Sequence, residues 1–511
     1  MRKQTKLVAV LSAAALLAIG ASMTSMAATG WTQQDGQWYY VDNSGDYVYD
    51  QWKKSGNSYF YLGDDGAMMT NALIQDGDNY YYVDANGAMV KSQWIQIAAD
   101  DSEDQDVEYR WYYFGSTGRA YRATSNFTKK TINGKKYAFD SEGKMLFGFV
   151  TDDGVMTNQD TDPVLNAQYY FGSNEDGAMY TGWLNYTEGV DDSEYDGEDS
   201  LWFYYNPSNG QKQVNKTDKK INGYYYTFDS YGVMKTDWQS ATNNTGATVS
   251  KYYNGDDQGW LEKKSWVWAV PSEEIDAITG STDNDDDQYR WFYVGSDGKT
   301  TVSTSKRING KWYMFDEAGR MKSGLLELNA PKINDATEVV KAFDSDEDDV
   351  DAVYAVKSGD LYYFGDEETD GAMKTGSSVK VEMADDTYTM GFYKTGKAYA
   401  GVENNKLYRN GVLQTAGDMR YKAIRYEGKV YVVGTTGTIV KAKNVAKDAD
   451  DNYFAVTKDG AVYFVEAADE AATVARGIAQ GKTSVKYDGQ EYKMADYDAI
   501  PVEGDEGEID M

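Results

Sequence analysis

Short runs of aromatic residues alternate with polar turns along the chain, and the alternation repeats at a nearly fixed interval. The three clearest copies begin with Ile-Asn-Gly at Ile132, Ile221 and Ile308, and each continues with an aromatic run, an Asp and a second Gly. The two glycines of each copy lie nine residues apart, and a Met follows the second Gly by two. Asn-Gly favours a two-residue turn because both residues tolerate positive φ, and aromatic runs favour strands. Each copy is therefore predicted to be a β-hairpin of about 20 residues.

Similar hairpins precede and follow these three copies. Three close-set ones lie between Gly30 and Trp94, and worn copies continue beyond Lys380, where Val replaces much of the Tyr. A single hairpin cannot bury a core, whereas stacked hairpins bury their faces against their neighbours. The predicted fold is all-β, a solenoid of tandem β-hairpin repeats. Trp111, Trp202 and Trp291 follow one another by 91 and 89 residues, which groups the hairpins into modules of about 90 residues.

The pattern divides the chain into five segments. Residues 1–27 are expected to be a signal peptide, because a basic start precedes an uncharged apolar run and small residues at Ser25 and Ala27. The other four segments are N-terminal hairpin repeats at 28–97, three longer repeat modules with acidic inserts at 98–400, degenerate C-terminal repeats at 401–465, and an acidic, partly disordered tail at 466–511.

Composition narrows the possible chemistry. The 511 residues include neither Cys nor His, which excludes disulfides, Cys/His zinc sites and His-dependent triads, and no cofactor or metal is expected. The formal charge is −32, and removal of three signal-peptide cations gives −32 − 3 = −35. Nucleic acid is therefore not an expected partner, since phosphate contacts need Lys and Arg. The acidic inserts at 100–108, 191–199 and 283–287 are expected to be solvated loops rather than ordered calcium sites.

The aromatic strands are richer in rings than one packed face requires. In the run Trp38-Tyr39-Tyr40, the first and third residues share one face and Tyr39 takes the other. One aromatic face can pack between hairpins while the other lines a groove of electron-rich rings. The alternative is that all of these rings belong to the core.

The order Gly-Trp, Trp-Tyr-Tyr and Gly-x-Met, as at Gly30-Trp31, Trp38 to Tyr40 and Gly66 to Met68, resembles the cell-wall-binding repeats of the choline-binding protein family. The Asn-Gly copies also resemble carbohydrate-binding repeats of clostridial toxins and streptococcal glucan-binding proteins. The resemblance implies sites between successive hairpins, each with a Trp from Gly-Trp, a Trp from Trp-Tyr-Tyr and a Tyr from the next hairpin. The candidate ligand-binding residues are Trp31, Trp38, Trp52, Tyr61, Tyr82, Trp94, Trp111, Trp183, Trp202, Trp238, Trp291 and Trp312.

The resemblance implies a secreted, non-catalytic protein, held non-covalently at the cell surface by wall choline or neutral glycans. A glucan-binding accessory protein and a structural or adhesive spacer are the alternatives. A wall hydrolase is a further one, against which stands the lack of a long non-repetitive segment. No transmembrane segment is expected after signal cleavage, and the pattern predicts no particular oligomeric state.

Overall fold

The computed structural model describes residues 29–99, 107–157, 163–188, 195, 200–244, 248–255, 258–271, 289–357, 360–365, 371–509 and 511. The expected signal peptide and nearly all of the acidic inserts lie outside these residues, so those interpretations stay predictions. The chain divides into two compact units, Met1–Lys235 and Thr236–Met511.

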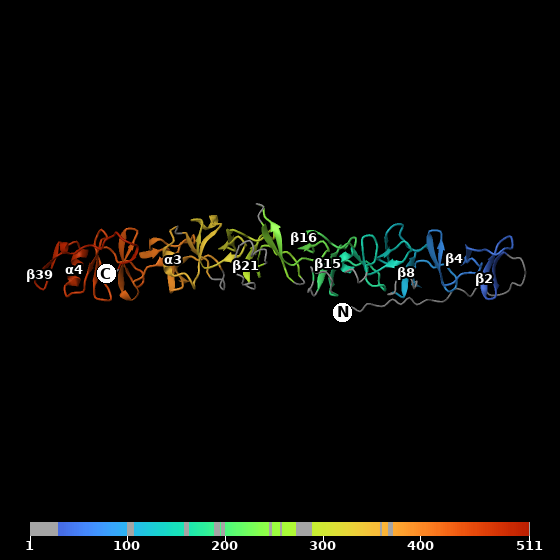
Figure 1. Cartoon of the computed structure of the whole chain (residues 1–511), viewed down its shortest axis with the longest axis horizontal. Coiled ribbons are helices and arrows are strands. Elements are labelled where there is room, and N and C mark those ends of the chain that lie inside the picture. Colours follow the sequence, from blue (N-terminus) through green and yellow to red (C-terminus); the bar gives the residue numbers. More distant parts are fainter. Residues whose placement is uncertain are drawn as a thin grey trace. The chain divides into compact units, whose positions relative to one another are not determined.

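The first unit is a succession of antiparallel hairpins, each formed by strands adjacent in sequence (Figure 1). Its strand pairs are β1 (Gly30–Gln34) with β2 (Gln37–Val41), β3 (Gln51–Ser55) with β4 (Ser58–Leu62), β5 (Ala72–Asp76) with β6 (Asn79–Val83), β7 (Gln93–Ala98) with β8 (Tyr109–Phe114), β12 (Phe149–Val150) with β13 (Tyr169–Tyr170), β14 (Gly182–Tyr186) with β15 (Leu201–Tyr205), and β16 (Lys216–Ile221) with β17 (Tyr224–Phe228). In a further sheet β10 (Lys135–Phe139) pairs with both β9 (Thr128–Ile132) and β11 (Met145–Leu146), and the one-turn helix α1 spans Pro163–Asn166.

The second unit begins in the same way and then forms broader sheets. Its two-stranded sheets are β18 (Asp237–Thr242) with β19 (Thr248–Tyr253), β20 (Ser265–Ala269) with β21 (Arg290–Val294), and β38 (Ser484–Tyr487) with β39 (Gln490–Lys493). In its three-stranded sheets the central strands are β23 (Lys311–Phe315) between β22 (Thr304–Ile308) and β24 (Met321–Lys322), β25 (Leu325–Leu328) between β26 (Val339–Phe343) and β27 (Leu361–Tyr363), β33 (Tyr421–Tyr426) between β34 (Lys429–Gly434) and β40 (Gly507–Glu508), and β36 (Tyr453–Val456) between β35 (Val445–Lys447) and β37 (Val462–Val465). Its five-stranded sheet has the order β28 (Gly376–Glu382), β29 (Thr387–Phe392), β32 (Val412–Leu413), β31 (Lys406–Arg409), β30 (Gly401–Glu403). Its helical elements are α3 (Val350–Tyr354), α4 (Ala471–Ala479), η2 (Ile333–Asp335), η3 (Gly417–Met419) and η4 (Met494–Asp496).

The Asn-Gly turns adopt the conformation that the sequence predicts. Asn133 and Gly134 have φ values of 50° and 85°, and Asn222 and Gly223 have 50° and 99°. Positive φ at both central residues is the type I′ pattern that suits the twist of a tight hairpin. The prediction of an all-β fold made of small hairpins is therefore confirmed.

The Gly-x-Met motif forms the joint between successive hairpins. The backbone N–H of Met68 donates to the Trp38 carbonyl at 2.7 Å, and that of Met89 donates to the Tyr59 carbonyl at 2.8 Å. The Met68 side chain covers Gly87 of the next hairpin so closely that a Cβ there would lie 2.7 Å from Met68 Cε. Further joints of this kind pair Met89 with Gly118, Met145 with Gly177, Met179 with Gly210, Met321 with Gly371 and Met373 with Gly396.

In one joint a lysine replaces the methionine. Lys212 donates its backbone N–H to the Gln168 carbonyl at 2.9 Å, as the Met residues do to their own neighbours, and packs against Gly232. Its side chain is only 3% exposed, and Nζ donates to the carbonyls of Val164 and Leu165 at 2.7 and 2.9 Å. Lys212 therefore ties the end of helix α1 to the joint.

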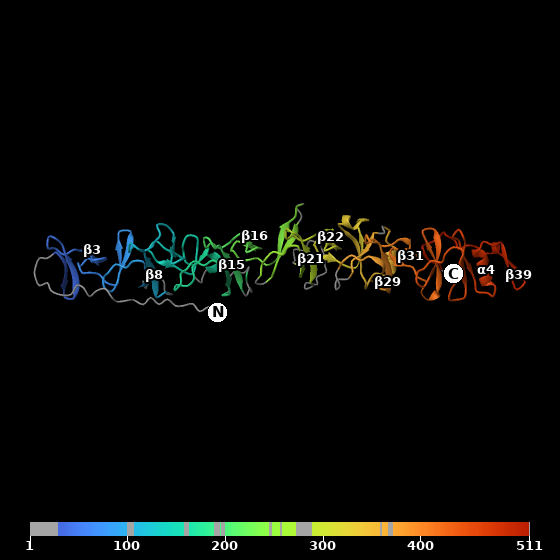
Figure 2. The same cartoon turned by 180° about the vertical axis from the view of Figure 1, so that it is seen from behind.

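Residues 466–511 differ from the acidic, partly disordered tail that composition suggests. Helix α4 buries Ala471, Val474, Ala475 and Ile478 and contacts β36 and β38, and Figures 1 and 2 both show it near β39. These positions follow helical periodicity, which the average acidity of the segment conceals. Farther on, β40 pairs with β33, so part of the expected tail is folded. No helix among the described residues combines the length and the hydropathy needed to span a bilayer.

Candidate functional site: aromatic cages between hairpins

The first site forms where two hairpins meet. Trp31 on β1 lies directly across from Tyr40 on β2, and Trp38 occupies the same face one step nearer the turn. The next hairpin contributes Phe60 from β4. The Trp31 ring meets Tyr40 edge-on at a centroid distance of 5.4 Å and Phe60 at 5.3 Å.

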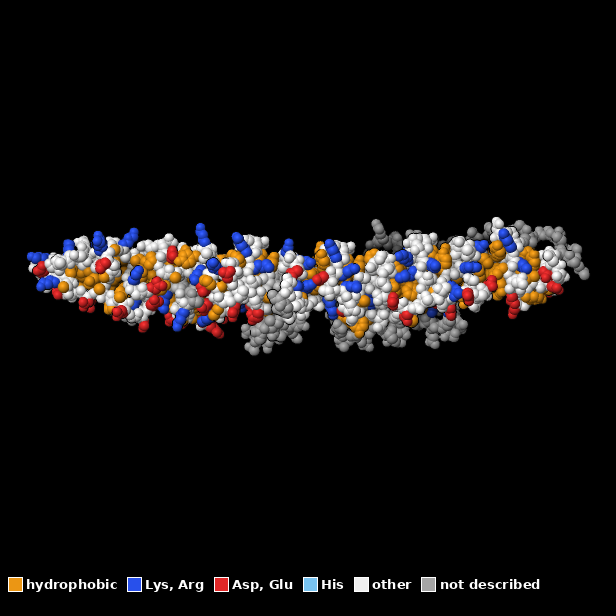
Figure 3. All heavy atoms as spheres, turned by 90° about the horizontal axis from the view of Figure 1, so that it is seen from above, with side chains coloured by type: hydrophobic (Ala, Val, Ile, Leu, Met, Phe, Trp, Pro, Cys, Tyr) orange, Lys and Arg blue, Asp and Glu red, His pale blue; other side chains and the backbone are white. Residues whose placement is uncertain are grey.

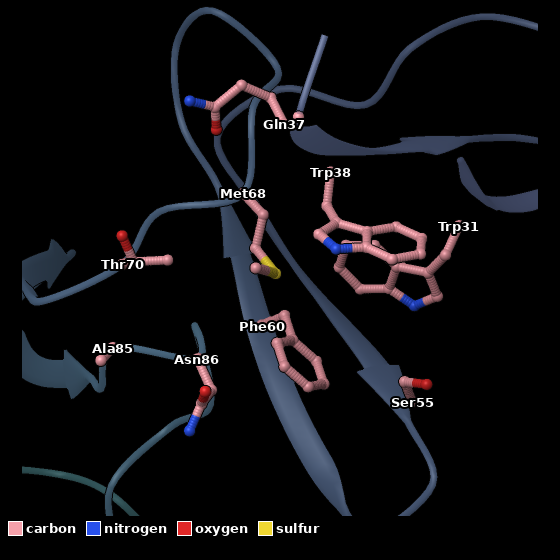
Figure 4. Close-up of a pocket in the computed structure, with 10 residues that line it drawn as sticks. Trp31, Gln37, Trp38, Ser55, Phe60, Met68, Thr70, Ala85 and Asn86 are labelled. Atoms are coloured by element: carbon pink, nitrogen blue, oxygen red, sulfur yellow. The ribbon is translucent and has the colours of Figure 1, made fainter. Parts of the chain in front are cut away.

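A cavity of about 430 Å³ opens among Trp31, Trp38, Phe60 and Met68 (Figure 4). Polar side chains also line it, namely those of Gln37, Ser55, Thr70 and Asn86. We call this arrangement cage 1, defined by Trp31, Trp38 and Phe60. Its large apolar side chains are the three rings and Met68, so it suits a cation without N–H donors or the apolar face of a small ligand.

Three further cages repeat this construction. They are cage 2 (Trp94, Trp111, Tyr137), cage 3 (Trp183, Trp202, Tyr226) and cage 4 (Trp266, Trp291, Tyr313). The two Trp centroids are 6.2, 6.3 and 6.1 Å apart, with interplanar angles of 89°, 80° and 85°. The first Trp lies 4.9, 4.7 and 4.8 Å from the third ring, at 65°, 63° and 67°. Cages 2 and 3 lie in the first unit and cage 4 in the second, so the same geometry arises from three different local sequences.

Lysine side chains accompany the cages. The third ring of each cage pairs across the hairpin with a basic residue, in the pairs Phe60 with Lys53, Tyr137 with Lys130, Tyr226 with Lys219 and Tyr313 with Lys306. Lys53 Nζ lies 5.2 Å from the centroid of Tyr40, and Lys306 Nζ lies 5.4 Å from that of Tyr293. Tyrosine rings beside these cages thus already attract the protein's own ammonium groups. Figure 3 shows such basic side chains among hydrophobic and acidic ones at the surface of both units.

Burial favours the neutral form of the tyrosines in cages 2 and 3. Burial raises the pKa of Tyr137 and of Tyr226 above its ordinary value of 10.0. The indole N–H groups of Trp31 and Trp111 are buried and have no hydrogen-bond partner within the part of the chain that the structure describes.

The structure brings seven of the predicted residues into cages: Trp31, Trp38, Trp94, Trp111, Trp183, Trp202 and Trp291. Trp52 lies between Tyr61 and Tyr81 and donates its indole N–H to Asp76 at 3.2 Å, but Tyr59 stands where a cage has its second Trp. Trp238 donates to the Val270 carbonyl at 2.8 Å and also lacks a second Trp. Trp312 packs against a core cluster that includes Leu326 and Tyr362, on the opposite strand face from Tyr313.

The predicted third walls, Tyr61 and Tyr82, are displaced by one residue. Tyr61 pairs with Trp52 inside its own hairpin, and Tyr82 packs near Phe114. Their neighbours Phe60 and Tyr81 approach Trp31 and Trp52 instead. Because strand side chains alternate, a shift of one residue moves a ring to the other face.

Sequence reasoning missed Trp266 and the third rings at Phe60, Tyr137, Tyr226 and Tyr313. Trp266 has no preceding Gly, so the Gly-Trp motif does not identify it. The equivalence of Trp266 and Trp94 shows only in the structure, where Lys264 and Ser92, each two residues before the Trp, both have a φ of 51°.

Comparison with known proteins supports the class of the N-terminal repeats. Residues 46–88 match the choline-binding repeat, and residues 29–47 match a cell wall binding repeat. The chain is 26% identical over 247 residues to glucosyltransferase-S of Streptococcus mutans, an alignment that covers 47% of this chain but only 14% of that protein.

Two solved structures from Streptococcus pneumoniae share a general likeness. Choline binding protein F, crystallised in the presence of a peptidoglycan analogue, is 19% identical, with a TM-score of 0.31 over 74% of this chain and 100% of that one. CbpJ is 17% identical, with a TM-score of 0.37 over 68% and 99%.

Residues 29–88 therefore match repeats of the cell-wall-binding class. Within them, residues 46–88 match the choline-binding repeat, which confirms the resemblance that the motifs indicate. Cage 1, formed by Trp31, Trp38 and Phe60, lies inside the matched residues.

Proposed function

We propose that this protein is a secreted, non-catalytic wall-binding protein whose cages take the trimethylammonium group of choline on wall polymers. The observation that carries the proposal is the recurrence of one geometry in cages 2, 3 and 4, where Trp–Trp distances agree within 0.2 Å (6.1 to 6.3 Å). Core packing alone does not require such agreement, since packed rings adopt many arrangements.

The chemistry of the cages fits a quaternary ammonium group. Such a group has positive charge but no N–H donor, so it needs ring faces rather than hydrogen-bond acceptors. Ring contacts of about 0.5–1 kcal/mol each, together with partial burial of methyl groups at about 0.8 kcal/mol each, sum to about 4 kcal/mol. One cage should therefore bind choline with a Kd of about 1 mM.

Repetition makes sites of this strength useful. Four cages on one chain can engage several choline groups of one polymer, and linked sites gain roughly 10²–10⁴ in avidity. The formal charge of −32 also favours the approach of a cationic group. Retention at the wall would then be non-covalent and reversible by free choline.

Tryptophan fluorescence of the purified full chain, titrated with choline chloride, tests this proposal. Trp94→Ala should remove roughly a quarter of the saturable change, because one of four cages is lost. Trp312→Ala is the matched control, since Trp312 lies outside every cage and should leave the choline response intact. Absence of a saturable response, or equal losses in both variants, would favour the spacer in which the rings are core only.

A zymogram tests the non-catalytic part of the proposal. The chain lacks His and Cys, so we expect no clearing of peptidoglycan or glucan at the mass of the purified protein. A band that disappears on substitution of one Asp or Glu would identify a wall hydrolase instead.

A further inference from the structure

Cage 4 has beside it an exposed Trp that the other cages lack. Trp268 on β20 is 47% exposed and lies directly across the hairpin from Trp291. Its ring is 4.9 Å from that of Trp291 and 5.8 Å from that of Tyr289, and the planes of Trp268 and Tyr289 differ by only 22°. Tyr289 is itself 52% exposed. Two large, stacked rings are therefore about half exposed beside a cage.

The equivalent position in the other cages holds an amide side chain. Gln33, Gln96 and Asn185 lie across from Trp38, Trp111 and Trp202. The hairpins fold with the amide in place, so the exposed Trp268 is not required by the architecture. An exposed Trp is unusual because burial of its large apolar surface favours folding. Together with the exposed ring of Tyr289 it offers a surface that a ligand can cover.

We infer that Trp268 and Tyr289 form a platform for the pyranose ring of a neutral, gluco-configured glycan. A pyranose whose substituents are equatorial presents a flat face of axial C–H groups, which matches an open aromatic ring in size and polarity. The phenol of Tyr289 can exchange hydrogen bonds with sugar hydroxyls. A protein partner would need a contact surface of roughly 1,200–2,000 Å², of which the two rings would be only a small part.

A small cation is also a poorer occupant of the platform. Ring faces that remain open to water hold a cation only weakly, whereas the neighbouring cage surrounds it with three rings. The inference rests on the proposed wall-binding function only for the source of the glycan. The platform adjoins cage 4 through Trp291, so a glycan and a choline group of one wall polymer could be held side by side.

Fluorine NMR of the full chain labelled with 5-fluorotryptophan separates the two sites. The chain has 13 Trp, and the signal lost in Trp268→Gln is assigned to the platform. Cellotetraose should shift the Trp268 signal, whereas choline chloride should shift the signals of Trp94 and Trp183. A galactose tetrasaccharide should shift the Trp268 signal less, because its axial hydroxyl interrupts one face of each ring.

Matched variants test the assignment. Trp268→Gln installs the residue of cage 2 and should lower cellotetraose affinity at least about fivefold while leaving the choline response of Trp94 unchanged. Tyr289→Ala should weaken the glycan by a similar factor. Gln96→Trp should create a second glycan-responsive signal, since cage 2 already has Tyr109 beside Trp111 at 6.0 Å.

Three results would overturn the inference: glycan binding that Trp268→Gln leaves unchanged, no glycan response at Trp268, or a choline response at Trp268 without a glycan response. Failure of the proposed function is distinguishable, because it would abolish the choline shifts of Trp94 and Trp183 and leave the glycan shift of Trp268 in place.

Discussion

Replacement of Gly87 with Ala should loosen the joint between the second and third hairpins. The new Cβ would lie 2.7 and 2.8 Å from Met68 Cε and Sδ, about 1 Å inside normal contact. The end of the Met68 side chain is flexible and borders the cavity of cage 1, so it can move aside and the overlap costs only about 1 kcal/mol, the low end of overpacking. Gly87 also has a φ of 77°, and a Cβ in this region adds about 1 kcal/mol. The joint should therefore lose about 2 kcal/mol of local stability.

Hydrogen exchange of the full chain measures this loss where it occurs, because repeat arrays respond to nearest-neighbour terms. The Met89 N–H, which donates to the Tyr59 carbonyl across this joint, should exchange about 30-fold faster, as the loss of about 2 kcal/mol requires. Exchange in β36 and β37 should not change.

Gly77→Ala is the control for backbone strain alone. Gly77 has a φ of 59°, but no atom lies within 4 Å of the position that a Cβ would take there, so its replacement should cost only about 1 kcal/mol. In the double variant Gly87→Ala with Met68→Ala, the overlap disappears and part of the stability should return. Equal effects of Gly77→Ala and Gly87→Ala would refute the packing explanation.

Three further predictions concern buried groups. Burial lowers the pKa of Lys212 to about 7 from 10.5, so the unfolded chain binds more protons than the folded chain between these pH values. The free energy of unfolding should therefore rise with pH from 7 toward 10.5, by up to about 3 kcal/mol at pH 9.5. Thermal melting should show no such rise in the variant Lys212→Met, whereas the variant Lys216→Met, at an exposed position, should retain it. Burial raises the pKa of Tyr362 to about 12, so the contribution of its neutral phenol to stability is complete below pH 10 and is lost as the pH rises through 12. Alkaline unfolding should therefore begin at a higher pH in the variant Tyr362→Phe, but not in the control variant Tyr224→Phe. Val474 in α4 is 0% exposed, and its replacement by Ala should cost about 1–3 kcal/mol of stability. Hydrogen exchange of the α4 amides measures this loss, and an unchanged exchange rate would contradict the core role of Val474.

The hairpins could be predicted because their signals are local. Asn-Gly turns and aromatic runs determine a hairpin within a few residues, and Asn133, Asn222 and Asn309 all have the expected positive φ. The broader sheets beyond Gly376 were not predicted, because β29 and β32 pair across an intervening hairpin. Helix α4 escaped notice since its apolar spacing is short and surrounded by acidic residues.

The cages were predictable in kind but not in every member. The two Trp positions follow from a motif inside one hairpin, so Trp94 and Trp111 could be named. The third ring depends on which face of the next strand turns toward the first hairpin. That choice is made where two hairpins meet, by packing of residues from different repeats, such as Lys212 against Gly232 at cage 3. It leaves no signal within a single repeat.

One residue can belong both to a joint and to a cage. Met68 covers Gly87 of the third hairpin and also lines the cavity of cage 1 between the first two. A residue that sets the spacing of one pair of hairpins thus shapes the site of the pair before it. The cage distances in cages 2, 3 and 4 agree although the loops between their Trp-bearing strands differ in length, because the paired strands hold the two Trp rings and the next hairpin supplies the third.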